Sequence, residues 1–584
     1  RTAEMLRTRL FSALRRPSVL RSSRCLNTHT PANLHSHSQC HGDAHSKTRP
    51  SVEPSGPVRV RFAPSPTGML HLGGLRTALF NYLLSRRYGG EFILRIEDTD
   101  QKRLVKGAVD NIVRTLEWAG LTFDEGPGKP GDVGPYFQSQ RGDLYRKHAY
   151  QLLEKGAAYR CFCGSHRLES LRAEAAAQGR PPMYDRRCLH LSQQQIDEKL
   201  RVGEPYTIRF IAPNPADPGS ADVAQFYDIV HENMRFRGPA GFDDAVLLKS
   251  DGLPTYHLAN VVDDHFMRIT HVLRGEEWLI STPKHRALFM AFGWPVPQYA
   301  HLPLLMNSDG SKLSKRNRDG PLQGYIDAGY LPSAVVNYTA LLGWHPGSGD
   351  KELYELAELE QAFSLGGLSR SKSAVSRDRL DWLNKQHLQK AVSSDSAQSR
   401  DLAAIAASEI DQHVPGFSRL PDATDTALRA LRMCSDRLTF TRNLFDMAPY
   451  LFSNPDLGTE EAEKTIAKVP LETRTHLLQA AIAQLKTMAG PDPASATGDK
   501  AASKRWSGFA KDMALAASAS ASSNSDTLAQ KPVPKSHAMM MLRFALTGQS
   551  TGPKIPELLE FFDSRETTSR LERAVQKIVA ESLQ

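Results

Sequence analysis

The sequence predicts a multidomain α/β protein with a parallel sheet in its N-terminal part and helices in its C-terminal part. With 584 residues, the chain is too long for one hydrophobic core. Residues 53–155 alternate short β-branched runs with segments of helical period, which is typical of a parallel α/β sheet. Beyond about residue 330, segments of helical period dominate.

The N-terminal leader is strongly basic. Residues 1–50 hold nine Arg or Lys and two acids, so they carry +7 of the chain's net charge of +9. The first 30 residues contain seven Arg, no Lys and one acid, Glu4. This composition is typical of an organellar transit peptide, with a disordered basic tail as the alternative. We therefore expect residues 1–52 to be a transit peptide and leader, and the protein to act in the mitochondrial matrix.

The first motif is "VRVRFAPSPTGMLHLGGLRTALFNYLLSRR", residues 58–87. Alternating apolar residues and arginines predict a strand, prolines end it, and leucines at helical spacing predict a helix. Gly73 and Gly74 fall in the first helical turn, where they let a ligand approach the backbone. Because a helix N-terminus favours phosphate, we expect a phosphate site here, the alternative being an ordinary crossover.

The rest of the chain changes several times in composition and in predicted secondary structure. A second strand, "EFILRI", leads into the acidic loop "EDTD" and the helix "GAVDNIVRTLEWAG". Residues 159–244 mix Cys, Pro and short strands and read as an inserted module. Residues 490–536 are rich in Ala, Ser, Asp and Pro and indicate a flexible insertion, although "RWSGFAKDMALA" could form a short helix. No apolar run is long enough to span a membrane, and we expect a soluble protein with no membrane partner.

A second motif is the loop "SDGSKLSKRNRDG", residues 308–320. Lys312 and Lys315 lie between two glycines, and lysines on such a loop suit a polyphosphate whose charge grows during transfer. Taken alone, the loop would be read as a solvated charge run.

Together these motifs resemble the two signatures of class I aminoacyl-tRNA synthetases. The longer blocks "RFAPSPTGMLHLGGLRTALFNYLLSRRYGGEFILRIEDTD" and "LPTYHLANVVDDHFMRITHVLRGEEWLISTPKH" are similar to the bacterial and organellar glutamyl-tRNA synthetases. The resemblance runs from about Val58 to "LRFALTGQSTGP". It departs from the strict signatures in "HLGG", which lacks a second His, and in Arg316, where a Ser is usual.

The resemblance implies a domain plan. A Rossmann-like catalytic domain would occupy 53–155 and 246–330, interrupted by an acceptor-end-binding module at 156–245. A stem-contact region would follow at 331–395, then an all-α anticodon-binding domain at 396–584 that carries the insertion at about 490–536.

The resemblance also implies a glutamate site. A dicarboxylic amino acid needs two cations and one anionic acceptor, and Arg61, Arg274 and Glu97 meet that requirement. The structural alternative is that Arg61 and Glu97 form only an ion pair. The full implied glutamate set is Arg61, Phe62, Ala63, Ser65, Glu97, Tyr256, His257, Leu258, Ala259, Asn260 and Arg274.

The implied nucleotide site lies at the two signatures. ATP, accompanied by Mg²⁺, would bind His71, Gly73, Gly74, Glu277 and Lys315, with His71, Lys312 and Lys315 as catalytic residues. The glutamate α-carboxylate would attack the α-phosphate of ATP, releasing pyrophosphate, and the 2′-hydroxyl of the terminal adenosine of tRNA would then take the glutamyl group. Positioning and charge stabilisation would supply the catalysis.

A third motif joins "YRCFCGSHR" to "DRRCLH". Cys161, Cys163, Cys188 and His190 form two pairs that could hold a structural zinc ion, and some bacterial relatives carry the same pairing. The alternative is a small module packed around reduced cysteines, and His166 competes for the fourth position.

The resemblance thus implies a glutamate–tRNA ligase that acts on tRNA(Glu) as a monomer. Whether tRNA(Gln) is also charged stays open. The alternatives are a glutamyl transferase that modifies a tRNA base, whose relatives lack the long C-terminal half, and a non-catalytic RNA-binding relative.

Overall fold

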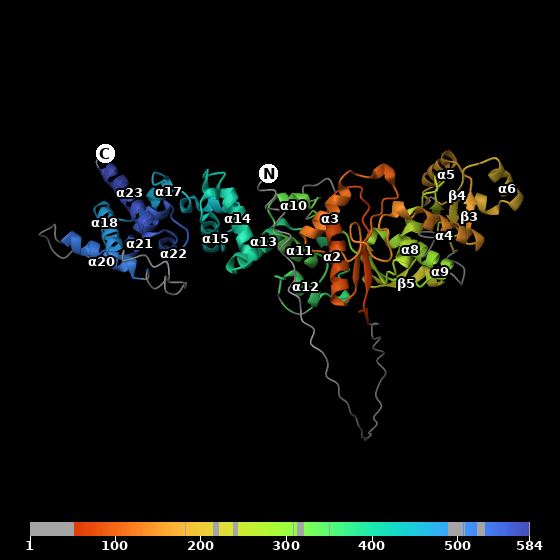
Figure 1. Ribbon diagram of the computed structural model, residues 1–584, viewed down its shortest axis with the longest axis horizontal. Helices are drawn as coiled ribbons and strands as arrows, with labels where there is room; N and C mark the ends of the chain where they lie inside the picture. Colours follow the sequence, from red (N-terminus) through yellow and green to blue (C-terminus); the bar gives the residue numbers. More distant parts are fainter. Residues whose placement is uncertain are drawn as a thin grey trace, which may run out of the picture. The chain divides into compact units, whose positions relative to one another are not determined.

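The structure is a computed structural model, which describes residues 52–180, 183–213, 221–236, 243–307, 309–311, 321–347, 349, 351–488, 506, 508–522 and 532–582. These residues fall into two compact units that meet in sequence between Leu380 and Asp381 (Figure 1). The predicted transit peptide, apart from residue 52, lies outside them.

The first unit holds the predicted parallel sheet. Strand β1 (Arg59–Phe62) pairs in parallel with β2 (Glu91–Leu94). A four-stranded sheet follows the order β6-β5-β9-β8, and its members are β5 (Gln225–Asp228), β6 (Glu232–Arg235), β8 (His271–Gly275) and β9 (Gln298–Leu302). Strands β5, β9 and β8 run parallel, whereas β6 is an antiparallel edge strand. The Thr270 amide donates to the Arg59 carbonyl at 2.9 Å, which brings β1 beside the start of β8.

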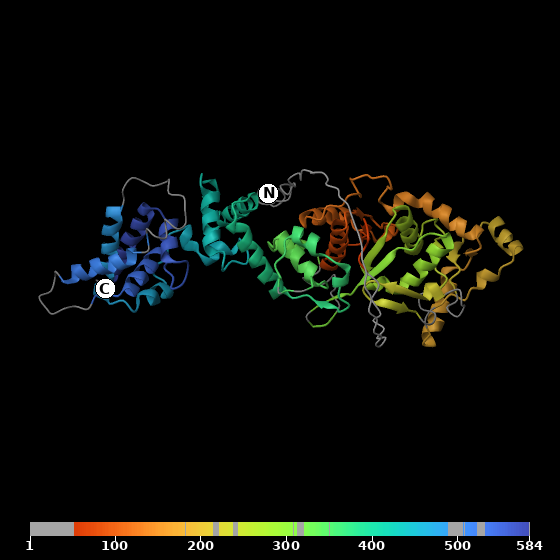
Figure 2. The same ribbon diagram turned by 90° about the horizontal axis from the view of Figure 1, so that it is seen from below.

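Helix α2 (Leu72–Arg87) covers this sheet and is buried on most of its surface. It packs against β1 and β8 and also against α11 (Pro332–Leu341) and α12 (Leu356–Ala362). Figures 1 and 2 show α2, in orange, beside these two green helices. Its leucines at positions 72, 75, 79 and 83 are fully buried, so apolar burial fixes the helix that the first motif predicted. The start of α2 is thereby held at the carboxyl end of β1.

Strand pairing does not follow the predicted boundary of the inserted module at 156–245. Strands β3 (Ala158–Cys161) and β4 (Thr207–Phe210) form an antiparallel sheet with β7 (Val246–Leu248), which lies just past that boundary. Strands β5 and β6 fall inside 156–245 but join the sheet of β8 and β9. The local sequence pattern predicted short strands in this region but not which strands pair with one another, because strand pairing depends on residues far away in the chain.

The other elements of the first unit are mostly helices. They are α3 (Ala108–Trp118), α4 (Gly142–Glu154), α5 (Ser165–Ala177), α6 (Gln193–Arg201), α7 (Ala221–Ala224), α8 (Tyr256–Phe266), α9 (Thr282–Phe292), α10 (Gln323–Asp327), the short strands β10 (Leu305–Met306) and β11 (Ser373–Ala374), and the 3₁₀ turns η1 (Gln101–Arg103), η2 (Gln138–Arg141), η3 (Arg187–His190), η5 (Glu276–Ser281) and η6 (Leu365–Gly367).

The second unit is helical throughout its described residues. It begins inside α13 (Arg377–Ser393), whereas the sequence predicted a boundary at 395–396. Its helices are α14 (Ala397–Ile410), α15 (Ala423–Cys434), α16 (Asn443–Met447), α17 (Glu460–Ile466), α18 (Leu471–Met488), α20 (Phe509–Ser522), α21 (Lys535–Thr547), α22 (Ile555–Phe561) and α23 (Ser564–Ser582), with 3₁₀ turns η7 (Phe417–Arg419) and η8 (Pro449–Leu451). No described helix of either unit is long and apolar enough to cross a membrane.

The predicted insertion at about 490–536 is not flexible throughout. Residues 489–505, 507 and 523–531 lie outside the described residues. Between them, α20 packs against α18 and α21, and Phe509 and Met513 are buried in that contact. The short helix that the sequence allowed at "RWSGFAKDMALA" forms as α20 and extends to Ser522, beyond the end of that stretch.

Candidate active site

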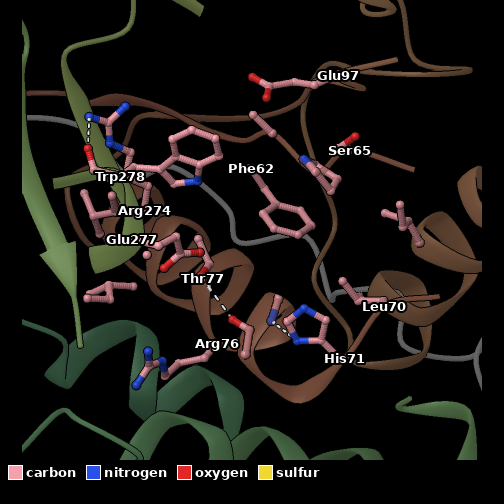
Figure 3. Close-up of a pocket in the computed structure, with 18 of the residues that line it drawn as sticks. Phe62, Ser65, Leu70, His71, Arg76, Thr77, Glu97, Arg274, Glu277 and Trp278 are labelled. Atoms are coloured by element: carbon pink, nitrogen blue, oxygen red, sulfur yellow. Dashed lines mark hydrogen bonds between the residues drawn. The ribbon is translucent and has the colours of Figure 1, made fainter. Parts of the chain in front are cut away.

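A cavity of about 640 Å³ opens at the carboxyl ends of β1, β8 and β9. Ligands bind at this edge in open parallel α/β sheets, because the loops that follow the strands converge there. Arg274, Glu97 and His71 approach the cavity from three sides (Figure 3). The cavity therefore combines a cation, an anion and the start of a helix.

At one end of the cavity, Glu97 is the anionic group. Its side chain is 10% exposed, and its carboxylate accepts from Arg95 at 3.2 Å and from the Asn260 amide at 3.3 Å. Burial raises the pKa of Glu97, against the opposing effect of nearby arginines. A cationic group entering the cavity would therefore stabilise the ionised carboxylate.

Arg61 lines the cavity but is already paired. Its Nε and Nη2 donate to the two carboxylate oxygens of Asp264 at 2.9 and 3.2 Å, and Asp264 also accepts from Arg95 at 2.7 Å. Arg61 and Asp264 are only 3% and 2% exposed. The alternative considered from the sequence, an ion pair between Arg61 and Glu97, does not form; Asp264 takes that place from α8.

Arg274 differs because only uncharged groups hold it. Its guanidinium donates to His301 Nε2, the Tyr256 hydroxyl, the Trp278 carbonyl, Thr282 Oγ1 and His285 Nδ1 at 2.9–3.3 Å. Among the described residues, no carboxylate lies within 4.0 Å of its nitrogens. Arg274 is thus a buried cation with an uncompensated charge at the cavity wall.

The other end of the cavity is the start of α2. His71 is the N-cap residue, and its Nδ1 accepts from the Gly74 amide at 3.1 Å. A Cβ on Gly73 would lie 3.3 Å from the His71 ring, and one on Gly74 would lie 2.7 Å from Leu70. The two glycines therefore keep the ring and the helix start close together. The first N–H groups of the helix and its positive dipole end face the cavity, which suits phosphate.

Glu277, Trp278 and Arg76 complete the wall between the two ends (Figure 3). The Trp278 ring lies 4.0 Å from the Tyr256 ring. Burial lowers the pKa of Arg76 to about 10, while the charges of Glu277 and Glu276 oppose that shift. Arg76 also donates to the carbonyls of Pro303 and Leu342, which ties α2 to the residue after β9 and to the end of α11.

The structure brings most of the predicted substrate residues to this cavity. Twelve of them line it: Arg61, Phe62, Ala63, Ser65, His71, Gly73, Gly74, Glu97, Tyr256, Asn260, Arg274 and Glu277. Lys312 and Lys315 lie outside the described residues.

Three predicted residues of "YHLAN" do not line the cavity. Leu258 and Ala259 belong to the hydrophobic core, and the Nδ1 atom of His257 lies 3.1 Å from His285 Nε2. These residues lie on α8, where successive side chains turn by about 100°, so only Tyr256 and Asn260 share the cavity face. Of the five predicted residues of this segment, only Tyr256 and Asn260 thus line the cavity.

The cysteine cluster forms, but without the predicted histidine. The sulfurs of Cys161, Cys163 and Cys188 lie within 4.8 Å of one another, and His190 is not part of the group. His190 is exposed on the turn η3, and His166 is also exposed. Instead, the Tyr184 hydroxyl lies 3.3 Å from the sulfurs of both Cys161 and Cys163.

The cysteines are free thiols, and their geometry fits a tetrahedral zinc ion. Zinc–sulfur bonds of about 2.3 Å place sulfurs roughly 3.8 Å apart. The Cys163–Cys188 sulfur distance is 3.6 Å. A hydroxyl in contact with two of these sulfurs belongs to Tyr184, four residues before Cys188.

Sequence reasoning missed the groups that hold the site's charges. Asp264 lies eight residues after Tyr256 on the same face of α8, a spacing that could have indicated it. Asp228 and His301 carry no comparable local signal, because they come from separate strands and meet only in the sheet.

Comparisons with known proteins show the family of the chain. Residues 57–382 match the family described as "tRNA synthetases class I (E and Q), catalytic domain", and residues 510–575 match an "Anticodon binding domain". The chain is 39% identical over 530 residues to the glutamate–tRNA ligase of Chloroherpeton thalassium, covering 89% of this chain and 98% of that one. It is 43% identical over 415 residues to the Clostridium botulinum enzyme, covering 70% and 83%.

Solved structures give the same result. The glutamate tRNA ligase of Elizabethkingia meningosepticum, determined in complex with its amino acid, superposes with a TM-score of 0.73 at 33% identity. That match covers 89% of this chain and 99% of the other. The glutamate–tRNA synthetase of Elizabethkingia anophelis gives a TM-score of 0.71, also at 33% identity, and covers 89% and 100%.

Proposed function

The chain belongs to the class I glutamate–tRNA ligases, and we propose that it joins glutamate to tRNA(Glu) at the cavity formed by β1, β8 and α2. One observation carries this assignment of the site: Arg274 and Glu97 line the same cavity without contacting each other. Arg274 is a cation with only neutral partners, and Glu97 supplies an anion. A glutamate molecule presents the complementary charges, a side-chain carboxylate and an α-ammonium group.

In the first step, Arg274 binds the side-chain carboxylate and Glu97 accepts from the α-ammonium. This orientation directs the α-carboxylate toward the start of α2, where His71 and the helix N–H groups hold the ATP phosphates. Attack on the α-phosphate forms a P–O bond and breaks the bond to pyrophosphate, giving glutamyl-adenylate. Mg²⁺ accompanies the nucleotide and neutralises phosphate charge. Lys315 of the signature loop stabilises the departing pyrophosphate.

In the second step, the 2′-hydroxyl of the terminal adenosine attacks the activated carbonyl and AMP leaves. No covalent enzyme intermediate is required, so positioning and charge complementarity supply the catalysis. The helical second unit, whose residues 510–575 match an anticodon-binding domain, favours a tRNA ligase over a base-modifying transferase that lacks such a half.

The test is glutamate charging of tRNA(Glu) and tRNA(Gln), measured separately with the chain trimmed of residues 1–52. Charging of both would make the enzyme non-discriminating and imply a partner amidotransferase. Charging of tRNA(Glu) alone would make it discriminating. If folded protein charges neither, the proposal is refuted.

We also propose a structural zinc ion held by Cys161, Cys163 and Cys188, with the Tyr184 hydroxyl as the fourth group in place of His190. Three thiolates are ligands that zinc prefers, and no open position would remain for chemistry. Metal analysis should find about one zinc per chain in the wild type and in His190→Ala, and less in Tyr184→Phe. Wild-type protein without zinc would refute the site. A loss of zinc in His190→Ala but not in Tyr184→Phe would show that His190, and not Tyr184, is the fourth ligand.

The basic, acid-poor leader supports action in the mitochondrial matrix, with cleavage of the leader and a monomeric mature enzyme. Fusing residues 1–52 to a fluorescent reporter tests whether the leader directs a protein to mitochondria. Sedimentation of the trimmed chain tests whether the mature enzyme is a monomer. A reporter that stays in the cytosol would refute the proposed location.

A further inference from the structure

The uncharged environment of Arg274 is built across three neighbouring strands. Asp228 ends β5, His301 lies in β9 and Arg274 lies opposite His301 in β8. His301 Nδ1 lies 2.6 Å from the Asp228 carboxylate, and its Nε2 lies 3.0 Å from Arg274 Nε. Asp228, His301 and Arg274 are 0%, 0% and 5% exposed, so water does not substitute for any of these contacts.

The donors in this chain fix the protonation of His301. An arginine nitrogen can only donate, so His301 Nε2 must accept, and the ring proton must sit on Nδ1 facing Asp228. The other oxygen of Asp228 accepts from the amides of Val230 and His231 at 3.0 and 2.9 Å, which holds the carboxylate in place. The same rule makes His285 Nδ1 an acceptor for Arg274 Nη1.

The contrast with Arg61 shows what this arrangement achieves. Arg61 contacts the carboxylate of Asp264 directly, and the two charges compensate each other. Asp228 instead stays one imidazole ring away from Arg274. A carboxylate in direct contact with Arg274 would compete with a substrate carboxylate for the same guanidinium, whereas a neutral ring fixes the fork and leaves its charge in place.

We propose that Asp228 and His301 are positioning residues that hold Arg274 through an uncharged acceptor, so that its full charge is available to the side-chain carboxylate of glutamate. This inference rests on the proposed function, because it assigns Arg274 to that carboxylate. Burial lowers the pKa of His301 to about 4 against the opposing hydrogen bond to Asp228, which agrees with a neutral ring.

The test compares variants that keep or remove the donor and acceptor pattern at position 301. In His301→Gln, the amide can donate to Asp228 and accept from Arg274, so we expect a KM for glutamate within about threefold of wild type. In His301→Leu, neither bond remains, and we expect that KM to rise at least tenfold while the KM for ATP stays within about twofold.

Thr282→Val guards against misfolding of the leucine variant, because it changes one hydroxyl at nearly constant volume. The Thr282 hydroxyl lies 3.1 Å from His301 Nε2 and accepts from Arg274 Nη2 at 2.9 Å, so its loss should raise the KM for glutamate at least threefold. The matched control is Thr339→Val, a buried threonine of the same unit whose hydroxyl has no partner among the described residues. It should leave both KM values unchanged.

The possible outcomes distinguish a failure of the positioning role from a failure of the proposed glutamate-charging activity. Wild-type protein that fails to charge any tRNA with glutamate refutes the proposed function. An active wild type with unchanged glutamate KM in Thr282→Val and folded His301→Leu refutes the positioning role. Equal damage in His301→Gln and His301→Leu also refutes it, because ring shape rather than donor and acceptor pattern would then matter.

Discussion

Replacing Arg274 by alanine should remove most of the enzyme's affinity for glutamate in the transition state. The two longest contacts of its guanidinium, both 3.3 Å, run from Nη1 to the Tyr256 hydroxyl and from Nη2 to the Trp278 carbonyl, and both partners line the cavity. A substrate carboxylate can replace these two partners and accept two charge-assisted hydrogen bonds. At about 1.5–3 kcal/mol each, their loss costs about 3–6 kcal/mol. That loss corresponds to a fall of roughly 10²–10⁴-fold in kcat/KM for glutamate.

The assay is the initial rate of tRNA(Glu) charging as a function of glutamate concentration, with the KM for ATP measured beside it. Arg268→Ala is the control, because Arg268 is an exposed arginine of the same unit, paired with Asp132 at 3.0 Å. Arg274→Lys should fall between wild type and Arg274→Ala, since it keeps the charge but loses the planar fork. A folded Arg274→Ala protein with kcat/KM for glutamate within threefold of wild type would refute the assignment.

Three further changes test other parts of the molecule. Asp264→Asn should lower the free energy of unfolding by about 3–5 kcal/mol, because two buried arginines lose their shared partner. Burial raises the pKa of Asp264 but the two arginines lower it further, so its folded-state pKa is depressed. The stabilisation is therefore present above the unfolded-state pKa of about 3.9 and is lost as the pH falls through the folded value, and thermal unfolding should show the variant's deficit shrinking in acid. Glu97→Gln should raise the KM for glutamate. In the wild type we expect this KM to rise in acid as Glu97, whose pKa is raised by burial, becomes protonated, and the variant should not show that rise. A variant whose KM still rises in acid would contradict this role. Cys163→Ser should retain far less than one zinc per chain by elemental analysis, and full zinc content in that variant would exclude Cys163 as a ligand.

Local patterns in the sequence were sufficient to predict the strand, turn and helix that frame the site. The strand that ends at Phe62, the proline turn and the helix that starts at Leu72 follow from residues within one or two turns of each other. The same holds for the short helix α20 inside a segment of otherwise low complexity. The resemblance of the long blocks to a known family then implied the reaction, and the comparisons confirmed that family.

Only the tertiary structure decided which charged groups are free and which are already paired. Arg61 and Arg274 are equivalent as residue types, yet Asp264, 203 residues from Arg61, compensates the first, while His301 and His285 leave the second uncompensated. The cysteine cluster likewise gained Tyr184 instead of His190. The physical reason is the range of the interactions: helix period and turn chemistry depend on near neighbours, whereas the pairing of a buried charge depends on side chains that meet only when distant strands and helices pack together.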